Sequence, residues 1–184
     1  MLAVTAMMDA AQTESGGFTL VELMVVVAVV AILAGVAYPS MRDVVDARRV
    51  RVAAAEFMTA IQLARSEAIH RGERVDLAAI DNDWRNGWTV FVDRNRNRIA
   101  DAGDDILLRQ PAMSGLLQIE SGLLDRSLHY LAYHPTGRSR TDASPQQPQF
   151  GTLRFRVGGQ RRHIVLNMLG RPRLCTPAAG SDSC

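Results

Sequence analysis

The chain has 184 residues, which fits one domain plus a separate segment. Hydrophobic residues make up 47% of it but aromatic residues only 5%, which favours a modest aliphatic core and excludes a large one. The formal net charge of +2 makes the chain only mildly basic, yet all 21 basic residues are Arg. That bias reflects the base composition of the genome, selection for planar, bidentate contacts to phosphate and carboxylate groups, or both.

Residues 18–38 form an apolar run of 21 residues whose single charge is Glu22. As an α-helix this run would be about 31 Å long, which matches the hydrocarbon core of a bilayer. Pro39 ends or kinks the run, and the charged residue Arg42 follows soon after. The pattern therefore predicts a membrane-spanning helix over 18–40.

Two other classes of N-terminal segment fit this run less well. A secretory signal peptide has a basic start, whereas residues 1–17 contain no Arg and carry Asp9 and Glu14. An ordinary membrane anchor would not contain Glu22, because a carboxylate near mid-depth costs about 2.5–3.5 kcal/mol. A buried carboxylate is tolerable only when it is paired, so Glu22 is a candidate functional residue.

The hexapeptide Gly-Phe-Thr-Leu-Val-Glu over 17–22, followed by an unbroken apolar run, resembles the class III prepilin signal of type IV pilin-like proteins. The resemblance implies that prepilin peptidase cuts between Gly17 and Phe18 and that Phe18 is then N-methylated. It also implies that Glu22 pairs with the N-terminal amine of a neighbouring subunit. The leader 1–17 departs from the family pattern because it is acidic. The Arg residues that follow the helix also run against the positive-inside rule.

Residues 41–71 keep a helical period, with one apolar stripe along the helix. The stripe consists of Val50, Ala54, Phe57, Ile61, Ala64 and Ala68. We expect the stripe to pack on a sheet and Gly72 to end the helix. One helix over about 18–71, bent near Pro39, would then be assembly helix in its first half and domain core in its second half.

Strand patterns occupy residues 73–175. The predicted strands lie at 74–80, 87–92, 106–109, 116–120 and 127–133, followed by a late hairpin. The expected fold class is α+β, a type IV pilin-like fold with a long N-terminal helix on an antiparallel β-rich head. The expected divisions are a leader over 1–17, an assembly helix over 18–40 and a periplasmic head over 41–184.

The late hairpin turns at Gly158-Gly159, and its second strand is expected to reach Met168. A two-residue turn fixes the register of the two strands. That register pairs Val157 with Gln160, Arg156 with Arg161, and Arg154 with His163. Three Arg and one His would then share one face, and like charges directly opposite each other are destabilising. Such a face is either a solvated outer surface or one that needs nearby carboxylates or an anionic partner.

An acidic loop between the strands invites a calcium interpretation. Its candidate ligands, at positions 1, 3, 5, 9 and 12 of an EF-hand-like loop, are Asp93, Asn95, Asn97, Asp101 and Asp104. Position 6, however, is Arg98 instead of Gly, position 12 is not Glu, and a predicted strand precedes the loop. We therefore expect the loop's Arg and Asp side chains to pair with each other, with calcium as the weaker alternative. Residues 87–95 also resemble a structural signature of the pilin-like family.

Both cysteines, Cys175 and Cys184, lie in the last ten residues and bracket a segment rich in Pro, Gly and Ser. Neither belongs to a set with zinc-ligand spacing. We expect a disulfide that holds the tail 175–184, which would indicate an oxidising compartment. The alternative is two unrelated thiols.

The sequence Gly170-Arg171-Pro172-Arg173 lies just before the tail. In an extended chain its two Arg would point to the same side, about 6.6–6.8 Å apart, with Pro172 fixing the backbone between them. Each guanidinium group can bind a pair of phosphate oxygens. The form Gly-Arg-x-Arg after a strand resembles the DNA-binding motif of the FimT subgroup of GspH/FimT pilin-like proteins, the minor pilins of natural transformation. A second copy over 137–140 resembles a structural turn of the same family.

The predicted function is therefore a minor type IV pilin that binds DNA without sequence preference, for uptake in natural transformation. Its expected DNA-binding residues are Gly170, Arg171, Arg173, Arg154, Arg156 and Arg161. Its expected partners are other pilin or pseudopilin subunits, prepilin peptidase, the inner membrane and DNA. The alternative is a structural minor pseudopilin of type II secretion, which has no need of the basic motif. We expect no enzyme and no cofactor, because the sequence shows no nucleophile–base pair, phosphate loop or metal set.

Overall fold

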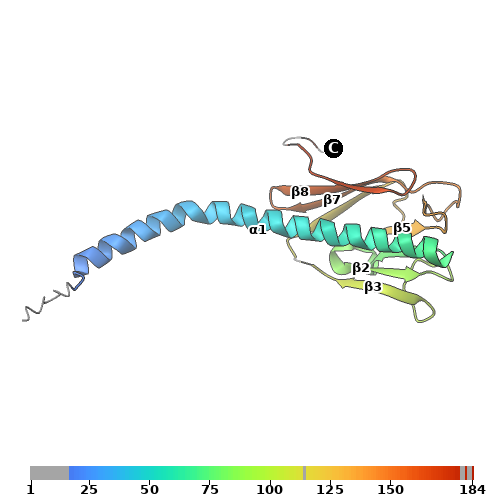
Figure 1. Ribbon diagram of the computed structural model, residues 1–184, viewed down its shortest axis with the longest axis horizontal. Coiled ribbons are helices and arrows are strands. Elements are labelled where there is room, and N and C mark those ends of the chain that lie inside the picture. Colours follow the sequence, from blue (N-terminus) through green and yellow to red (C-terminus); the bar gives the residue numbers. More distant parts are fainter. Residues whose placement is uncertain (1–16, 114, 179–180, 182–183) are drawn as a thin grey trace, which may run out of the picture. The chain divides into compact units, whose positions relative to one another are not determined.

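The computed structural model describes residues 17–113, 115–178, 181 and 184, without the side chains of 36–40. The chain divides into two compact units, Met1–Ser40 and Met41–Cys184, which are considered separately below. One helix, α1 (Leu20–Arg71), contributes to both units (Figure 1). All of the predicted leader before Gly17 lies outside the described residues.

The first unit consists of the N-terminal part of α1. Thr19 precedes the helix, and its Oγ1 accepts a hydrogen bond from the backbone N–H of Glu22 at 3.2 Å, as in a helix N-cap. The large apolar side chains from Leu20 to Leu33 are all exposed in this unit. No helix has, among the described residues, an apolar stretch of the length needed to cross a membrane. The membrane-spanning role predicted for 18–40 is thus not confirmed, and the bend near Pro39 stays a prediction.

In the second unit, the remainder of α1 buries the predicted apolar stripe. All six stripe residues are buried, and Ala53 and Ala60 extend the same buried face. The helix ends at Arg71, where Gly72 takes the left-handed conformation (φ 68°) and donates its N–H to the carbonyl of Ala68 at 3.1 Å. The stripe and the helix stop were thus both predicted correctly.

Two antiparallel sheets complete the head. The five-stranded sheet has the order β3-β2-β1-β5-β6 and the four-stranded sheet the order β4-β7-β8-β9. The strands of the first are β1 (Val75–Ala79), β2 (Gly87–Val92), β3 (Asp105–Pro111), β5 (Tyr130–Tyr133) and β6 (Ser139–Arg140). The strands of the second are β4 (Gln118–Leu123), β7 (Gly151–Val157), β8 (Gln160–Leu166) and β9 (Pro172–Cys175). Two short 3₁₀ helices, Ile80–Asn82 and Trp84–Asn86, connect β1 to β2.

Three of the predicted strands have other bounds in the structure, two of them because side chains make local hydrogen bonds. The strand expected over 127–133 begins only at Tyr130, since Asp125 accepts hydrogen bonds from the N–H and hydroxyl of Ser127. The strand expected over 116–120 lies later, as β4, where it pairs with β7. Finally, β8 ends at Leu166 and not at Met168, because Asn167 Oδ1 accepts the N–H of Leu169 and turns the chain.

One hydrophobic cluster joins α1 to both sheets. Phe57 of α1 lies at its centre, with ring centroids 4.9 Å from Trp84, 4.9 Å from Trp88 and 5.4 Å from Phe155, all in edge-to-face arrangements. Trp88 belongs to the five-stranded sheet and Phe155 to the four-stranded sheet, so the helix side chain bridges the two. Every buried residue of this cluster falls between Val50 and Leu166. The head over 41–184 therefore contains this whole core, and we expect it to fold on its own.

Candidate nucleic-acid interface

The hairpin of β7 and β8 has the predicted register. Val157 pairs with Gln160, Arg156 with Arg161, and Arg154 with His163. The alternate residues Leu153, Phe155 and Val157 are buried in the core. Because residues that pair across an antiparallel sheet share a face, the Arg residues and His163 lie on the outer face of the four-stranded sheet.

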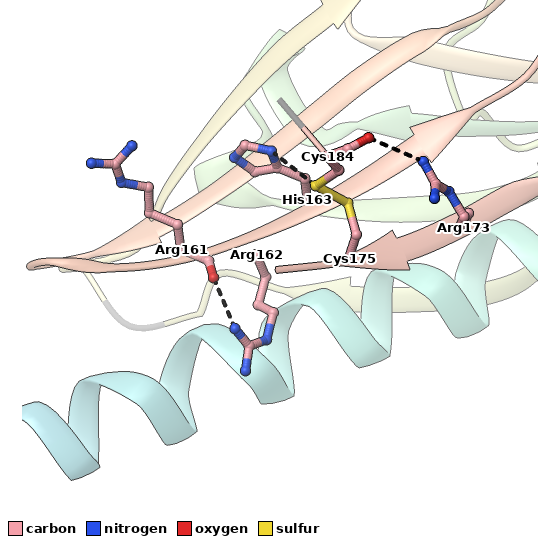
Figure 2. The surroundings of a disulfide bond; sticks show 6 residues. All are labelled: Arg161, Arg162, His163, Arg173, Cys175 and Cys184. Carbon is pink, nitrogen blue, oxygen red and sulfur yellow. Dashed lines mark hydrogen bonds between the residues drawn. A yellow bond between two sulfur atoms is a disulfide. The ribbon is translucent and has the colours of Figure 1, made fainter. Parts of the chain in front are cut away.

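The disulfide predicted between Cys175 and Cys184 is present, and it lies on this outer face (Figure 2). Cys175 pairs with His163 across β8 and β9, and Cys184 Sγ lies 3.8 Å from His163 Nδ1. His163 is consequently only 2% exposed. The three Arg and His163 therefore share one face, as predicted, but His163 is buried beside the disulfide.

A polar hollow of about 360 Å³ lies next to His163 over β4, β7 and β8. Gln118 Oε1 accepts two hydrogen bonds from Arg156, at 3.0 and 2.7 Å, which fix that guanidinium group. Glu120 stands directly opposite Arg154 in the ladder of β4 and β7. The hollow also includes Arg161, so the three predicted Arg of the hairpin lie together, beside one carboxylate.

The Gly-Arg-Pro-Arg motif forms a turn followed by the edge strand β9. Gly170 is buried in the left-handed conformation (φ 74°), where a Cβ atom would lie 2.6 Å from the backbone N of Ser139. Its carbonyl oxygen accepts a hydrogen bond from the buried hydroxyl of Tyr133 at 2.9 Å. Only glycine fits this position, because any side chain would be strained and would collide with a neighbouring strand.

The two Arg of the motif occupy different surroundings. Arg171 precedes β9, is exposed, and lines a groove with Pro172 and the α1 residues Gln62 and Arg65. Arg173, also exposed, pairs with Val165 on the outer face, and its Nη2 lies 3.5 Å from the carbonyl oxygen of Cys184. We expected both Arg to point to the same side of an extended chain. The strand begins only at Pro172, so Arg171 belongs to the turn and only Arg173 to the extended chain.

The carboxylates of the acidic loop accept hydrogen bonds from amide groups of the loop itself, and not from its Arg side chains as we expected. Asp93 accepts the backbone N–H groups of Asn97 and Arg98, both at 3.1 Å. Asp101 Oδ2 accepts the amide groups of Asn95 and Asn97, both at 2.9 Å. Within the described residues, no group of three or more His, Cys, Asp or Glu is arranged to hold a metal ion. The calcium assignment thus gains no support.

One buried ion network lies on the outer side of the five-stranded sheet. Arg74 donates two hydrogen bonds to Asp76, both at 2.7 Å, and one to Asp142 at 2.9 Å, and it lies 3.7 Å from Asp93. Burial raises the pKa of Asp76 to about 7, although Arg74 lowers it, and the neighbouring Asp93 raises it further. Arg98 adds a second cation, 3.5 Å from Asp142.

The N-terminal processing residues lie at the start of the first unit. Gly17 and Phe18 precede the helix, and the Phe18 side chain is 83% exposed. Glu22 lies in the first turn, where a carboxylate also interacts favourably with the helix dipole. Its side chain makes no hydrogen bond or ion pair among the described residues, so it is available to a second molecule.

A helix packed on two antiparallel sheets, preceded by a Gly-Phe-Thr-Leu-x-Glu segment, defines a pilin-like subunit. Two families match the chain: the prokaryotic N-terminal methylation motif over residues 14–38, and the type II transport protein GspH over residues 53–170. The chain therefore belongs to the GspH family, as a type IV pilin-like protein of the GspH/FimT type. The family and the fold are those of structural subunits.

Individual relatives agree with this assignment. Pilin-like protein PilA1 of Thermus thermophilus is 29% identical over 160 residues, which cover 86% of this chain and 97% of PilA1. Crystal structures of the type IV minor pilin FimU of Pseudomonas aeruginosa are similar, with a TM-score of 0.53. The first is 20% identical and covers 70% of this chain and 97% of FimU. That likeness confirms the predicted α+β minor pilin fold.

Proposed function

We propose that this subunit is a minor type IV pilin that binds DNA without sequence preference and serves DNA uptake in natural transformation. The observation that carries the proposal is the exposed pair Arg171 and Arg173 on either side of Pro172 at the edge strand β9. Arg171 has no hydrogen-bond or ion-pair partner for its side chain among the described residues. Such a guanidinium group is free to bind a phosphate.

The chemistry favours the phosphate backbone over the bases. A turn and an edge strand present the two guanidinium groups, whose forked geometry matches the oxygen pairs of phosphate groups. Binding should therefore be independent of sequence and sensitive to salt. Together with two Arg of the hairpin, the motif would make about four phosphate contacts, which gives a log–log salt slope near −3.6 for duplex DNA.

The assembly part of the proposal rests on the N-terminal methylation motif. Prepilin peptidase would cut between Gly17 and Phe18, and Phe18 would be N-methylated. Glu22 would then pair with the N-terminal amine of a neighbouring subunit, in a pilus that grows from the inner membrane. Replacing Glu22 by Ala should abolish incorporation into fibres, whereas replacing it by Asp should retain part of it. Normal incorporation of the Glu22→Ala subunit would contradict this role.

The DNA-binding part is tested with the soluble head, residues 41–184, which contains the whole core. Its affinity for a labelled duplex is measured by fluorescence anisotropy from 50 to 300 mM salt, for the wild type and for Arg171→Ala/Arg173→Ala. The double variant should lose about two units of the salt slope and most of the affinity. An unchanged affinity would remove this motif from the mechanism.

The second candidate is a minor pseudopilin of type II secretion, and the GspH family match favours it. It shares the fold, the processing and the subunit partners, and it likewise needs no enzymatic activity. It differs in having no use for nucleic acid. A wild-type head that binds no DNA at 50 mM salt would favour this candidate over the first.

A further inference from the structure

The two Gly-Arg turns of the chain pack against each other. The first turn ends at Gly137 (φ 70°), whose N–H donates to the carbonyl of His134 at 2.8 Å, and it leads into β6. The second turn contains Gly170 (φ 74°) and leads into β9. A Cβ atom on Gly170 would lie 2.6 Å from the N of Ser139 and 3.2 Å from the O of Gly137. The edges of the two sheets therefore meet at these two turns.

This contact brings together the Arg residues that follow the two glycines. Arg138 lies between the two residues that Gly170 touches, and Arg171 is bonded to Gly170. Their Cα atoms are consequently no more than about 10 Å apart, since consecutive Cα atoms are about 3.8 Å apart. Both side chains are exposed, and neither forms a hydrogen bond or ion pair within the described part of the chain.

A third cation comes from α1. Arg65 Nε donates a hydrogen bond to the carbonyl oxygen of Gly137 at 3.0 Å, which anchors the guanidinium group beside the first turn. Arg65 also lines the groove of about 420 Å³ that contains Arg171, Gln62, Ser66, Ile69 and Pro172. No carboxylate lines this groove among the described residues. The nearby Glu67 accepts a hydrogen bond from Arg71 at 2.6 Å, so its charge is already compensated.

We propose that Arg138, Arg171 and Arg65 form one phosphate-binding surface, in which the Gly137-Arg138 turn is the second half of the site at Gly170-Arg171. The proposal rests on the proposed DNA-binding function and extends its footprint from the edge of the four-stranded sheet across to α1 and β6. Arg138 and Arg171 contact phosphates directly. Arg65 positions the first turn through Gly137 and contributes charge to the groove.

From its resemblance alone, the second copy over 137–140 was expected to be a structural turn, and the proposal adds a binding role to that structural one. Gly137 makes the turn, while Arg140 donates to the carbonyl of Gln146 at 2.8 Å and is engaged there. Arg138 is the member of the copy that faces solvent without a partner among the described residues. The surface is therefore made of the first Arg of each copy.

The test compares Arg138→Ala with Arg109→Ala in the soluble head. Arg109 is an exposed Arg of β3, at the opposite edge of the five-stranded sheet from β6, and its removal changes the net charge equally. Duplex affinity is measured by anisotropy over the same salt series. We expect Arg138→Ala to lower the salt slope by about 0.9 and to weaken binding about five- to tenfold at 0.1 M salt. Arg138→Lys should keep most of the slope, because it keeps the charge.

Three results would count against the surface in different ways. Equal losses for Arg138→Ala and Arg109→Ala would show a general charge effect and overturn the inference. An unchanged affinity for Arg138→Ala, with affinity lost in Arg171→Ala/Arg173→Ala, would overturn the inference and leave the proposed function intact. A wild-type head without DNA binding would overturn the proposed function itself. Thermal unfolding of each variant, expected to be unchanged at these exposed positions, confirms that all of them are folded.

Discussion

Arginine has opposite roles in the two sheets of this head. Just before β1 of the five-stranded sheet, Arg74 is nearly buried and is surrounded by three carboxylates, those of Asp76, Asp93 and Asp142. At the edge of the four-stranded sheet, Arg171 is exposed and has no carboxylate beside it in the described residues. Arginine thus compensates buried carboxylates in one region and presents an exposed positive charge in the other.

The difference shows that the abundance of a residue type does not identify a binding site. All 21 basic residues are Arg, so composition cannot separate the two roles. The two roles differ in the residues that surround each Arg, and the fold brings those residues together from distant segments of the chain. A binding arginine is recognised by exposure and by the lack of a carboxylate partner, and a structural arginine by desolvation and compensation.

The largest effect on stability is expected from removing the buried Arg74 side chain. Arg74→Ala leaves buried carboxylates without their counter-charge, so the free energy of unfolding should fall by about 3–5 kcal/mol. Urea denaturation of the head followed by tryptophan fluorescence measures this. The matched control is Arg85→Ala, because Arg85 also pairs with an Asp but is exposed, and its loss should be much smaller. Similar losses for the two variants would remove the contrast.

Removing the disulfide should have the next largest effect. A bridge that closes a loop of this length is expected to stabilise by about 2–3 kcal/mol through the entropy of the unfolded chain. We expect Cys175→Ser/Cys184→Ser to lose that much in a urea titration, and to expose His163. Reducing agent should destabilise the wild type similarly and leave the variant unaffected. An equal response of the two proteins to the reductant would show that the bond does not stabilise the head.

The pH dependence of stability tests how strongly Arg74 compensates the buried carboxylate of Asp76. Because the pKa of Asp76 is raised to about 7 in the folded state, the folded protein holds a proton there that the unfolded chain releases near pH 4. Stability should fall as pH rises from about 4 to 7, by up to about 1 kcal/mol per unit, and then level off.

His134 contributes the opposite slope. Burial and the charges of neighbouring Arg residues lower its pKa, so the unfolded state binds the extra proton at acidic pH. The stability of the folded state therefore rises with pH up to about 6.5, the pKa of the unfolded state, and levels off above it. The comparison with Asp76→Asn separates the two groups, since that variant keeps the shape but cannot titrate. The difference in stability between wild type and variant should decline between pH 4 and 7. A difference independent of pH would mean that Asp76 stays ionised in the folded protein.

The smallest effect is expected at Arg156, on the exposed hairpin. Its partner Gln118 is neutral and both are at the surface, so Arg156→Ala should change the free energy of unfolding by less than about 0.5 kcal/mol. Under the proposed function it should still lower the salt slope for DNA by about 0.9. A large loss of stability here would place Arg156 with the structural arginines.

Local patterns in the sequence predicted the parts of the fold that depend on neighbours along the chain. The apolar stripe of α1 follows from its period, and the register of β7 and β8 follows from the two-residue turn. Strand ends were misjudged where a side chain competes with the ladder, as Asn167 does after β8. Residue spacing carries no information on that competition.

The contacts between distant segments could not be predicted in the same way. The packing of Gly170 against Gly137, and of Arg65 against the carbonyl of Gly137, joins residues that are 33 and 72 positions apart. The repeated Gly-Arg-x-Arg sequence was the available signal, but it does not say that the copies touch. Arg65 gave no signal beyond lying off the apolar stripe.

Under the proposed function, which packs many subunits into a fibre, the edge strand β9 has a further consequence. A free strand edge presents unpaired backbone groups that can recruit a strand from another molecule and start irreversible aggregation. Pro172 removes one of those donors, while Arg171 and Arg173 repel an approaching copy of the same edge. The Arg-Pro-Arg segment that is proposed to bind DNA would thereby also prevent neighbouring heads from pairing through their β9 edges.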